Sequence, residues 1–68
     1  MQTPTAVAAR LRHEAREHSR QAHRLRALAR VWSTGPIGSR DPIRALKLRI
    51  AAGERTSLAR ICREAVSS

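Results

Sequence analysis

The sequence has no phenylalanine or tyrosine, and it has one tryptophan and one cysteine among its 68 residues. Without these aromatic side chains the core must be thin, and the chain lacks the stacking surface on which many proteins hold single-stranded nucleic acid. The single cysteine, Cys62, excludes an intrachain disulfide. No apolar run reaches the roughly 18 residues that a membrane-spanning helix needs. We therefore expect a soluble, cytoplasmic protein.

Acidic residues are also scarce. Five Asp and Glu stand against fourteen Lys and Arg, which gives a formal net charge of +9 at pH 7. Thirteen of the fourteen basic residues are arginine, whose planar guanidinium binds phosphate through two parallel hydrogen bonds. A GC-rich genome would also enrich arginine and alanine, but it explains neither the charge nor the spacing. The composition favours a polyanionic partner, with nucleic acid first.

The spacing of the arginines adds to this argument. Seven arginines lie between residues 10 and 30, and four of them recur every fourth residue. At about 100° per residue, these four drift slowly around a helix and form one winding basic stripe. We expect this stripe and further basic residues to contact phosphate groups. The predicted nucleic-acid-binding residues are Arg12, Arg16, Arg20, Arg24, Arg30, Arg40, Arg44, Lys47 and Arg49.

A long N-terminal helix is predicted at about residues 4–32, because no Gly or Pro interrupts it after its start. Thr3 is the expected N-cap and Pro4 the expected first helical residue. The helix should end just after residue 32, since Gly35 favours a left-handed closing conformation and Pro36 cannot continue the helix.

One face of this predicted helix carries a heptad pattern, with small or apolar residues spaced alternately four and three apart. The alanines in its middle permit close approach of another helix but supply little burial energy. We expect the arginine stripe on the opposite side of the helix. The predicted helix-packing residues are Leu11, Ala15, His18, Ala22, Leu25, Ala29 and Trp32.

Residues 33–41 form the predicted linker, because they hold two glycines and a proline among small polar residues. Asp41 followed by Pro42 then repeats a helix-start signal.

The C-terminal half admits two interpretations. In the preferred one, a second helix at about residues 42–52 ends at Gly53 and a third spans about residues 57–66. In the alternative, one helix continues through Gly53, at a cost of about 1 kcal/mol for the glycine. Both interpretations predict one small all-α domain, an antiparallel helical hairpin. Because so short a chain buries little surface, we expect it to self-associate or to join a complex.

The sequence offers no catalytic or metal site. His13, His18 and His23 stand five residues apart, so an intact helix points them in different directions and they cannot share a metal ion. No Ser, His and Asp grouping is recognisable, and we expect neither an enzyme nor a bound cofactor. Cys62 lies on an apolar helix face, where we expect a buried, inert thiol.

Residues 50–53 (Ile-Ala-Ala-Gly) and 57–68 (Ser-Leu-Ala-Arg-Ile-Cys-Arg-Glu-Ala-Val-Ser-Ser) resemble the first two helices of helix-turn-helix domains of the transposase and small-terminase type. The resemblance implies DNA binding by a recognition helix that normally follows a glycine-containing turn. That glycine is absent after Ala65, so no base-contacting residue is assigned.

Two functions are compatible with these features. The first is non-catalytic binding of duplex DNA or structured RNA by a regulatory or accessory protein. The alternative is a small inhibitor or adaptor, of the kind encoded by phages and plasmids, that docks a helical hairpin on an acidic protein. Arginines that merely solvate a helix normally alternate with acids, and this stripe has almost none between them. A membrane-surface helix is disfavoured because alanine and histidine insert poorly.

Overall fold

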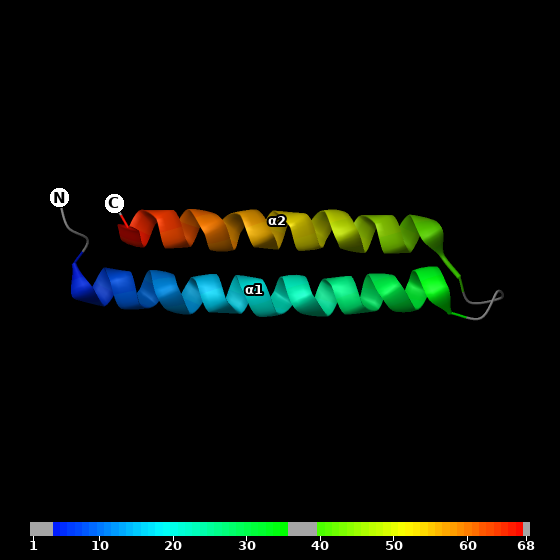
Figure 1. Ribbon diagram of the computed structural model, residues 1–68, viewed down its shortest axis with the longest axis horizontal. Helices are drawn as coiled ribbons and strands as arrows, with labels where there is room; N and C mark the ends of the chain where they lie inside the picture. The colour runs from blue at the N-terminus through cyan, green and yellow to red at the C-terminus, as the bar shows by residue number, and fades with distance from the viewer. Residues whose placement is uncertain (1–3, 36–39, 68) are drawn as a thin grey trace.

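The computed structural model describes residues 4–35 and 40–67. Two helices, α1 (Thr5–Thr34) and α2 (Pro42–Ser67), lie side by side and antiparallel, and the rod measures 55 × 13 × 10 Å (Figure 1). These residues contain no strand. The predicted all-α antiparallel hairpin is therefore confirmed. Thr3, the predicted N-cap, and residues 36–39 of the predicted linker lie outside the described residues.

The start of α1 differs slightly from the prediction. Pro4 lies outside the helix, with an extended ψ of 143°, and its carbonyl accepts a hydrogen bond from the N–H of Ala8 at 2.8 Å. Proline therefore occupies the cap position instead of the first helical turn, and no side chain of the described residues caps this end.

The end of α1 lies two residues beyond the prediction. The hydroxyls of Ser33 and Thr34 donate to the carbonyl of Arg30, at 3.2 and 2.7 Å. Gly35 donates its N–H to the carbonyl of Val31 at 3.0 Å, with φ −67° and ψ 179°. The predicted left-handed conformation of Gly35 is wrong. Glycine is needed here for a different reason, because a Cβ atom would lie 2.9 Å from the carbonyl oxygen of Val31.

The second helix begins at the Asp41-Pro42 pair. A carboxylate oxygen of Asp41 accepts a hydrogen bond from the backbone N–H of Arg44 at 2.9 Å, which satisfies one of the free donors of the first turn. The N–H of Asp41 also donates to the carbonyl of Trp32 at 3.0 Å, so the start of α2 is bonded to the last turns of α1.

The preferred break at Gly53 is wrong, because α2 runs without interruption from Pro42 to Ser67. Buried alanines lie on both sides of the glycine, at Ala45, Ala52 and Ala59. Their packing on α1 offsets the weak helix propensity of one glycine. The hydroxyl of Thr56 donates to the carbonyl of Ala52 at 3.0 Å, one turn earlier in the same continuous helix.

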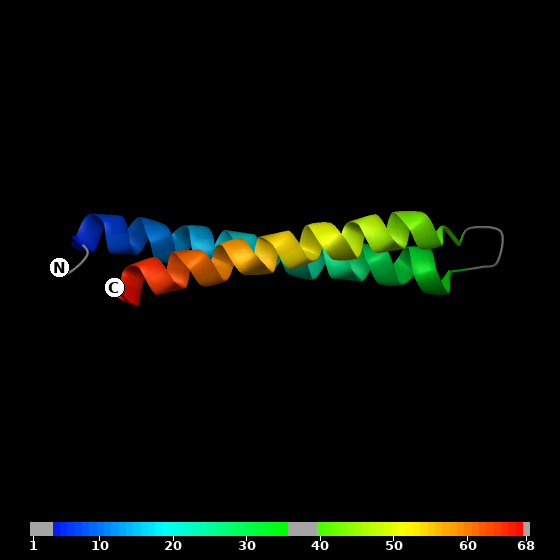
Figure 2. The same cartoon turned by 90° about the horizontal axis from the view of Figure 1, so that it is seen from above.

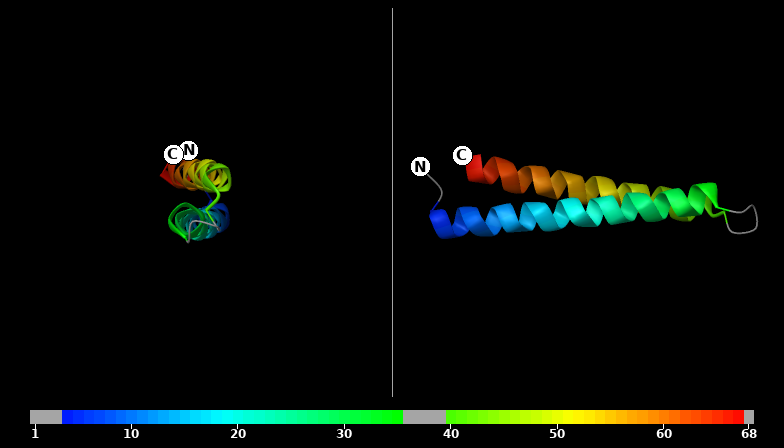
Figure 3. Two further views of the ribbon diagram at one scale, coloured as in Figure 1. Left: turned by 90° about the vertical axis from the view of Figure 1, so that its right-hand side faces the viewer. Right: turned by 60° about the horizontal axis from the view of Figure 1, so that its bottom comes forward.

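Alanine alone forms the core of the described chain. The buried residues recur every seventh position in both helices, and we call this row the alanine seam: Ala8, Ala15, Ala22 and Ala29 in α1, and Ala45, Ala52 and Ala59 in α2. A seven-residue repeat keeps a straight seam only if the helices coil gently around each other. Figure 2 shows the corresponding shallow crossing, and an end-on view shows two helices with no further layer (Figure 3).

Candidate functional site

The alanine seam separates two broad faces of the hairpin. In each helix, the residue three positions after a buried alanine lies on one side of the seam, and the residue four positions after it lies on the other. Contacts between the helices confirm that like positions meet. His18 and Arg55, both at the third position, come within 3.1 Å, whereas Ser19 and Arg63, both at the fourth, are hydrogen bonded at 2.9 Å.

A row of hydrogen bonds joins the helices along the second of these faces. Each step of seven residues forward in α1 meets a step of seven back in α2, and at each step a guanidinium from one helix donates to a hydroxyl of the other. We call this row the guanidinium–hydroxyl ladder. Its pairs are Arg63 to Ser19 (2.9 Å), Arg26 to Thr56 (2.7 Å) and Arg49 to Ser33 (3.4 Å).

Six exposed guanidinium groups lie on and beside this ladder. They come from both helices, and none makes an ion pair with a carboxylate in residues 4–35 and 40–67. We call this surface the basic face; it consists of Arg12, Arg16, Arg26, Arg30, Arg49 and Arg63.

The carboxylates lie mostly elsewhere. By their positions relative to the seam, Glu14, Glu17, Asp41 and Glu54 lie on or toward the other face. Three of these four pair with a basic residue of their own helix: Glu14 with Arg10 (3.7 Å), Glu17 with Arg20, and Asp41 with Arg44 (3.8 Å). Glu64 lies at the outer edge of the basic face and pairs with Arg60 at 3.9 Å. This separation leaves the basic face with a strongly positive potential.

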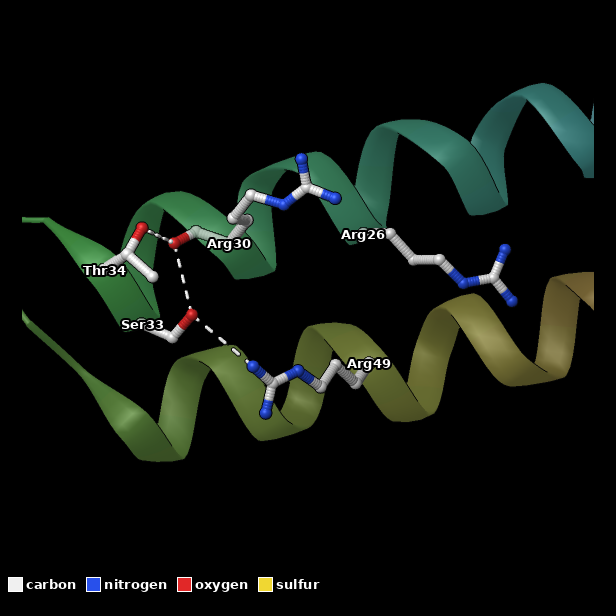
Figure 4. A pocket seen from close by; sticks show the side chains of 5 residues that line it. All are labelled: Arg26, Arg30, Ser33, Thr34 and Arg49. Carbon is white, nitrogen blue, oxygen red and sulfur yellow. Dashed lines mark hydrogen bonds between the residues drawn. The ribbon is translucent and has the colours of Figure 1, made fainter.

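An open hollow of about 550 Å³ lies on the basic face near the turn, lined by Arg26, Arg30, Ser33, Thr34 and Arg49 (Figure 4). The hydroxyl of Ser33 donates to the carbonyl of Arg30 at 3.2 Å and accepts from Arg49 at 3.4 Å. Guanidinium groups are donors only, and no carboxylate lines the hollow. Its chemistry therefore suits an anion with several acceptor oxygens.

The structure does not bring the nine predicted cations together. Four of them, Arg12, Arg16, Arg30 and Arg49, lie on the basic face. The stripe does not lie opposite the seam as expected. It begins beside the seam at Arg12 and, drifting about 40° per four residues, reaches the far side of α1 at Arg24.

The other predicted cations have different surroundings. Arg20 pairs with Glu17, and Arg24 lines a second hollow, on the opposite face, with Leu25 and Glu54. The guanidinium of Arg44 lies 4.4 Å from the centre of the Trp32 ring. Arg40 donates to the carbonyl of Gly35 at 2.7 Å, and Lys47 is exposed on the outer side of α2.

Sequence reasoning missed Arg26 and Arg63, two of the six guanidinium groups of the basic face. The sequence does contain a signal for both. Arginine and a hydroxyl residue alternate every seventh position, as Arg12, Ser19, Arg26 and Ser33 in α1 and as Arg49, Thr56 and Arg63 in α2.

The predicted packing residues divide into two groups. Ala15, Ala22 and Ala29 are buried, with 3%, 1% and 1% of their surface exposed. Their larger neighbours on the third position are only half-buried: Leu11, His18, Leu25 and Trp32.

His18 and Cys62 lie on the other side of the seam, away from the basic face. The Nδ1 atom of His18 accepts a hydrogen bond from Arg55, since guanidinium cannot accept one. Cys62 is half-buried, not buried as expected.

Within the described ranges, no three His, Cys, Asp or Glu side chains gather as a metal site, and neither helix has the length and hydropathy to cross a membrane. The resemblance of residues 50–68 to helix-turn-helix domains stays a prediction. Comparisons with protein-family models, with curated proteins and with solved structures found no match to this chain.

Proposed function

We propose that this protein binds duplex DNA or structured RNA, without catalysis, through the basic face. One observation carries the proposal: six exposed guanidinium groups from two helices share one face, and no carboxylate of the described chain neutralises them. Like charges held together by a rigid hairpin repel one another, and a row of phosphates relieves that repulsion.

The dimensions of the rod suit a double helix. Its 55 Å length equals roughly 16 base pairs at a rise of about 3.4 Å each. Both helices supply guanidinium groups along this length, so the basic face meets several phosphates at once. If all six groups neutralise a phosphate, the logarithm of the affinity should fall with the logarithm of salt concentration with a slope of about −5.

Contacts of the basic face with the nucleic-acid backbone would set the position of the protein on its ligand. Phosphate contacts fix position but carry no sequence information. The single tryptophan, Trp32, lies on the other side of the seam, so the basic face has no aromatic ring for stacking of unpaired bases. We therefore expect a preference for structured over single-stranded nucleic acid.

Fluorescence anisotropy tests the proposal. Equal lengths of duplex DNA, hairpin RNA and unstructured single strand are titrated at several salt concentrations. We expect the two structured ligands to bind more tightly, with a steep salt dependence. Affinity that barely changes with salt, or tighter binding of the single strand, would contradict the proposal.

The alternative function, docking on an acidic protein, would use the same charges. A pull-down from nuclease-treated extract distinguishes the two functions. Recovery of one acidic protein in stoichiometric amount, together with weak binding of purified duplex, would replace nucleic-acid binding by an inhibitor or adaptor role.

A further inference from the structure

The face opposite the basic face carries large apolar side chains from both helices, with charged residues among them. It holds the large apolar side chains that stand three positions after or one position before a buried alanine, whereas the exposed Val31, Ile43, Leu46, Ile50 and Ile61 lie outside it. We call it the apolar face; it consists of Val7, Leu11, Leu25, Leu28, Trp32, Leu48, Ala51, Leu58, Cys62 and Ala65.

Much of this apolar face is open to solvent. Val7 is 48% exposed, Leu28 50% and Leu58 42%, and the remaining members are half-buried. The hairpin itself buries only alanines, and no large side chain of the described chain is fully buried. Alanine removes little apolar area from water, so the contact between α1 and α2 supplies little of the hydrophobic stabilisation that a folded domain needs.

We propose that the apolar face packs against the apolar face of a second copy of this chain, which gives a four-helix homodimer. The leucines and Trp32 then form the large-residue core that the single hairpin lacks. This inference goes beyond the proposed function, because it concerns the opposite face and would hold even if no nucleic acid were bound.

Charge favours a second copy as the occupant. A chain of formal charge +9 should repel its own copy, but four of its five carboxylates lie on or toward the apolar face. There they accompany Arg10, Arg24, Arg44 and Arg55, so this side is close to neutral. Two copies that meet through their apolar faces keep their basic faces on opposite outer sides, with the greatest separation between like charges.

The area of the apolar face also fits an interface with a second copy. A face of 55 by 13 Å offers roughly 700 Å² per protomer, close to the contribution of each partner in a stable interface of standard size. The contact would run the full length of the hairpin without any further segment.

Light scattering under reducing conditions, over about 1–200 μM protein, tests the dimer directly. The expected mass is twice the chain mass of 7.6 kDa, and it should fall toward one chain on dilution. Trp32 is the only tryptophan and lies on the apolar face, so its emission should shift to shorter wavelength as the dimer forms. A mass of one chain throughout, or an assembly larger than two chains, would overturn the proposal.

Matched variants locate the interface. Leu28→Ala with Leu58→Ala should raise the Kd of the dimer by about 100-fold, because both are large apolar side chains exposed on the apolar face. Ile43→Ala with Ile50→Ala is the control, since these residues are 66% and 55% exposed on the outer side of α2, away from the apolar face. The control should change the Kd by less than about threefold. All four sites are exposed and alanine favours helix, so the hairpin should fold, which circular dichroism checks. Loss of the dimer in the control pair but not in the leucine pair would overturn the proposed interface.

Discussion

The guanidinium of Arg26 donates a 2.7 Å hydrogen bond to the hydroxyl of Thr56, thirty residues later in the chain, and Thr56 donates its own hydrogen to the carbonyl of Ala52 at 3.0 Å. One side chain of the basic face is thus linked to the backbone of the alanine seam. The same arginine also lines the hollow on the basic face. This contact therefore links a pair of facing positions in the two helices to the placement of a positive charge on the basic face.

A double-mutant cycle on this pair should reveal a weak but measurable coupling. We expect Arg26→Ala and Thr56→Ala to show a coupling free energy of about 0.5 kcal/mol, since both side chains are exposed and water competes for the hydrogen bond. Urea unfolding of the four proteins measures it. Arg16→Ala replaces Arg26→Ala in the control cycle and should give no coupling with Thr56→Ala. Equal values in the two cycles would argue against the ladder.

The alanine seam should reject a larger side chain. Ala22 is 1% exposed, so Ala22→Leu forces the helices apart and should lower the free energy of unfolding by about 1–3 kcal/mol. Ala27 lies on the exposed side of the same helix, and Ala27→Leu should change stability by no more than about 0.5 kcal/mol. Thermal unfolding followed by circular dichroism compares the two. A more damaging change at Ala27 would contradict the placement of the seam.

The two described glycines should respond in opposite directions to alanine. No atom lies within 4 Å of a Cβ placed at Gly53, so Gly53→Ala should stabilise the protein by about 0.5–1 kcal/mol through better helix propensity. A Cβ at Gly35 would clash with the Val31 carbonyl, so Gly35→Ala should destabilise it by about 1 kcal/mol. The melting temperature of each variant, compared with that of the unmodified protein, shows whether the substitution stabilises or destabilises it. A lower melting temperature for Gly53→Ala would contradict the open surroundings of Gly53 in a continuous α2.

Removal of two charges should matter more on the basic face than elsewhere. We expect Arg16→Gln with Arg30→Gln to weaken duplex binding about tenfold or more and to reduce the salt slope by about 2. Arg10→Gln with Arg24→Gln removes the same charge from outside the basic face and should have a much smaller effect. Anisotropy titrations at matched salt compare the two pairs. Equal losses would mean that net charge, not the basic face, determines affinity.

The parts of the fold that depend on local pattern could be predicted from the sequence. The uninterrupted helical stretch before Gly35 gave α1, and the seven-residue recurrence of Ala15, Ala22 and Ala29 gave the face on which it packs. The path through Gly53 could not be predicted in this way. A glycine's local penalty favours a break, whereas the packing of Ala52 and Ala59 on a distant helix favours continuity.

The basic face was only partly predictable for a related reason. A four-residue arginine spacing describes one helix alone, and it groups Arg24 with Arg12 although they lie on different sides of the hairpin. The membership of Arg26 and Arg63 follows only when the register of α1 against α2 is known. The partners in each ladder pair are 16 to 44 residues apart in the chain, beyond the reach of local periodicity.

The seven-residue interval of the alanine seam also restricts how this protein can change in length. Deletion of one residue inside either helix would rotate every later side chain by about 100°, and arginines would then move into the place of leucines. Removal of seven residues from each helix at the same level would shorten the rod yet preserve both the basic face and the apolar face. Changes in length that keep the fold are therefore insertions or deletions of seven residues, made in both helices at the same level.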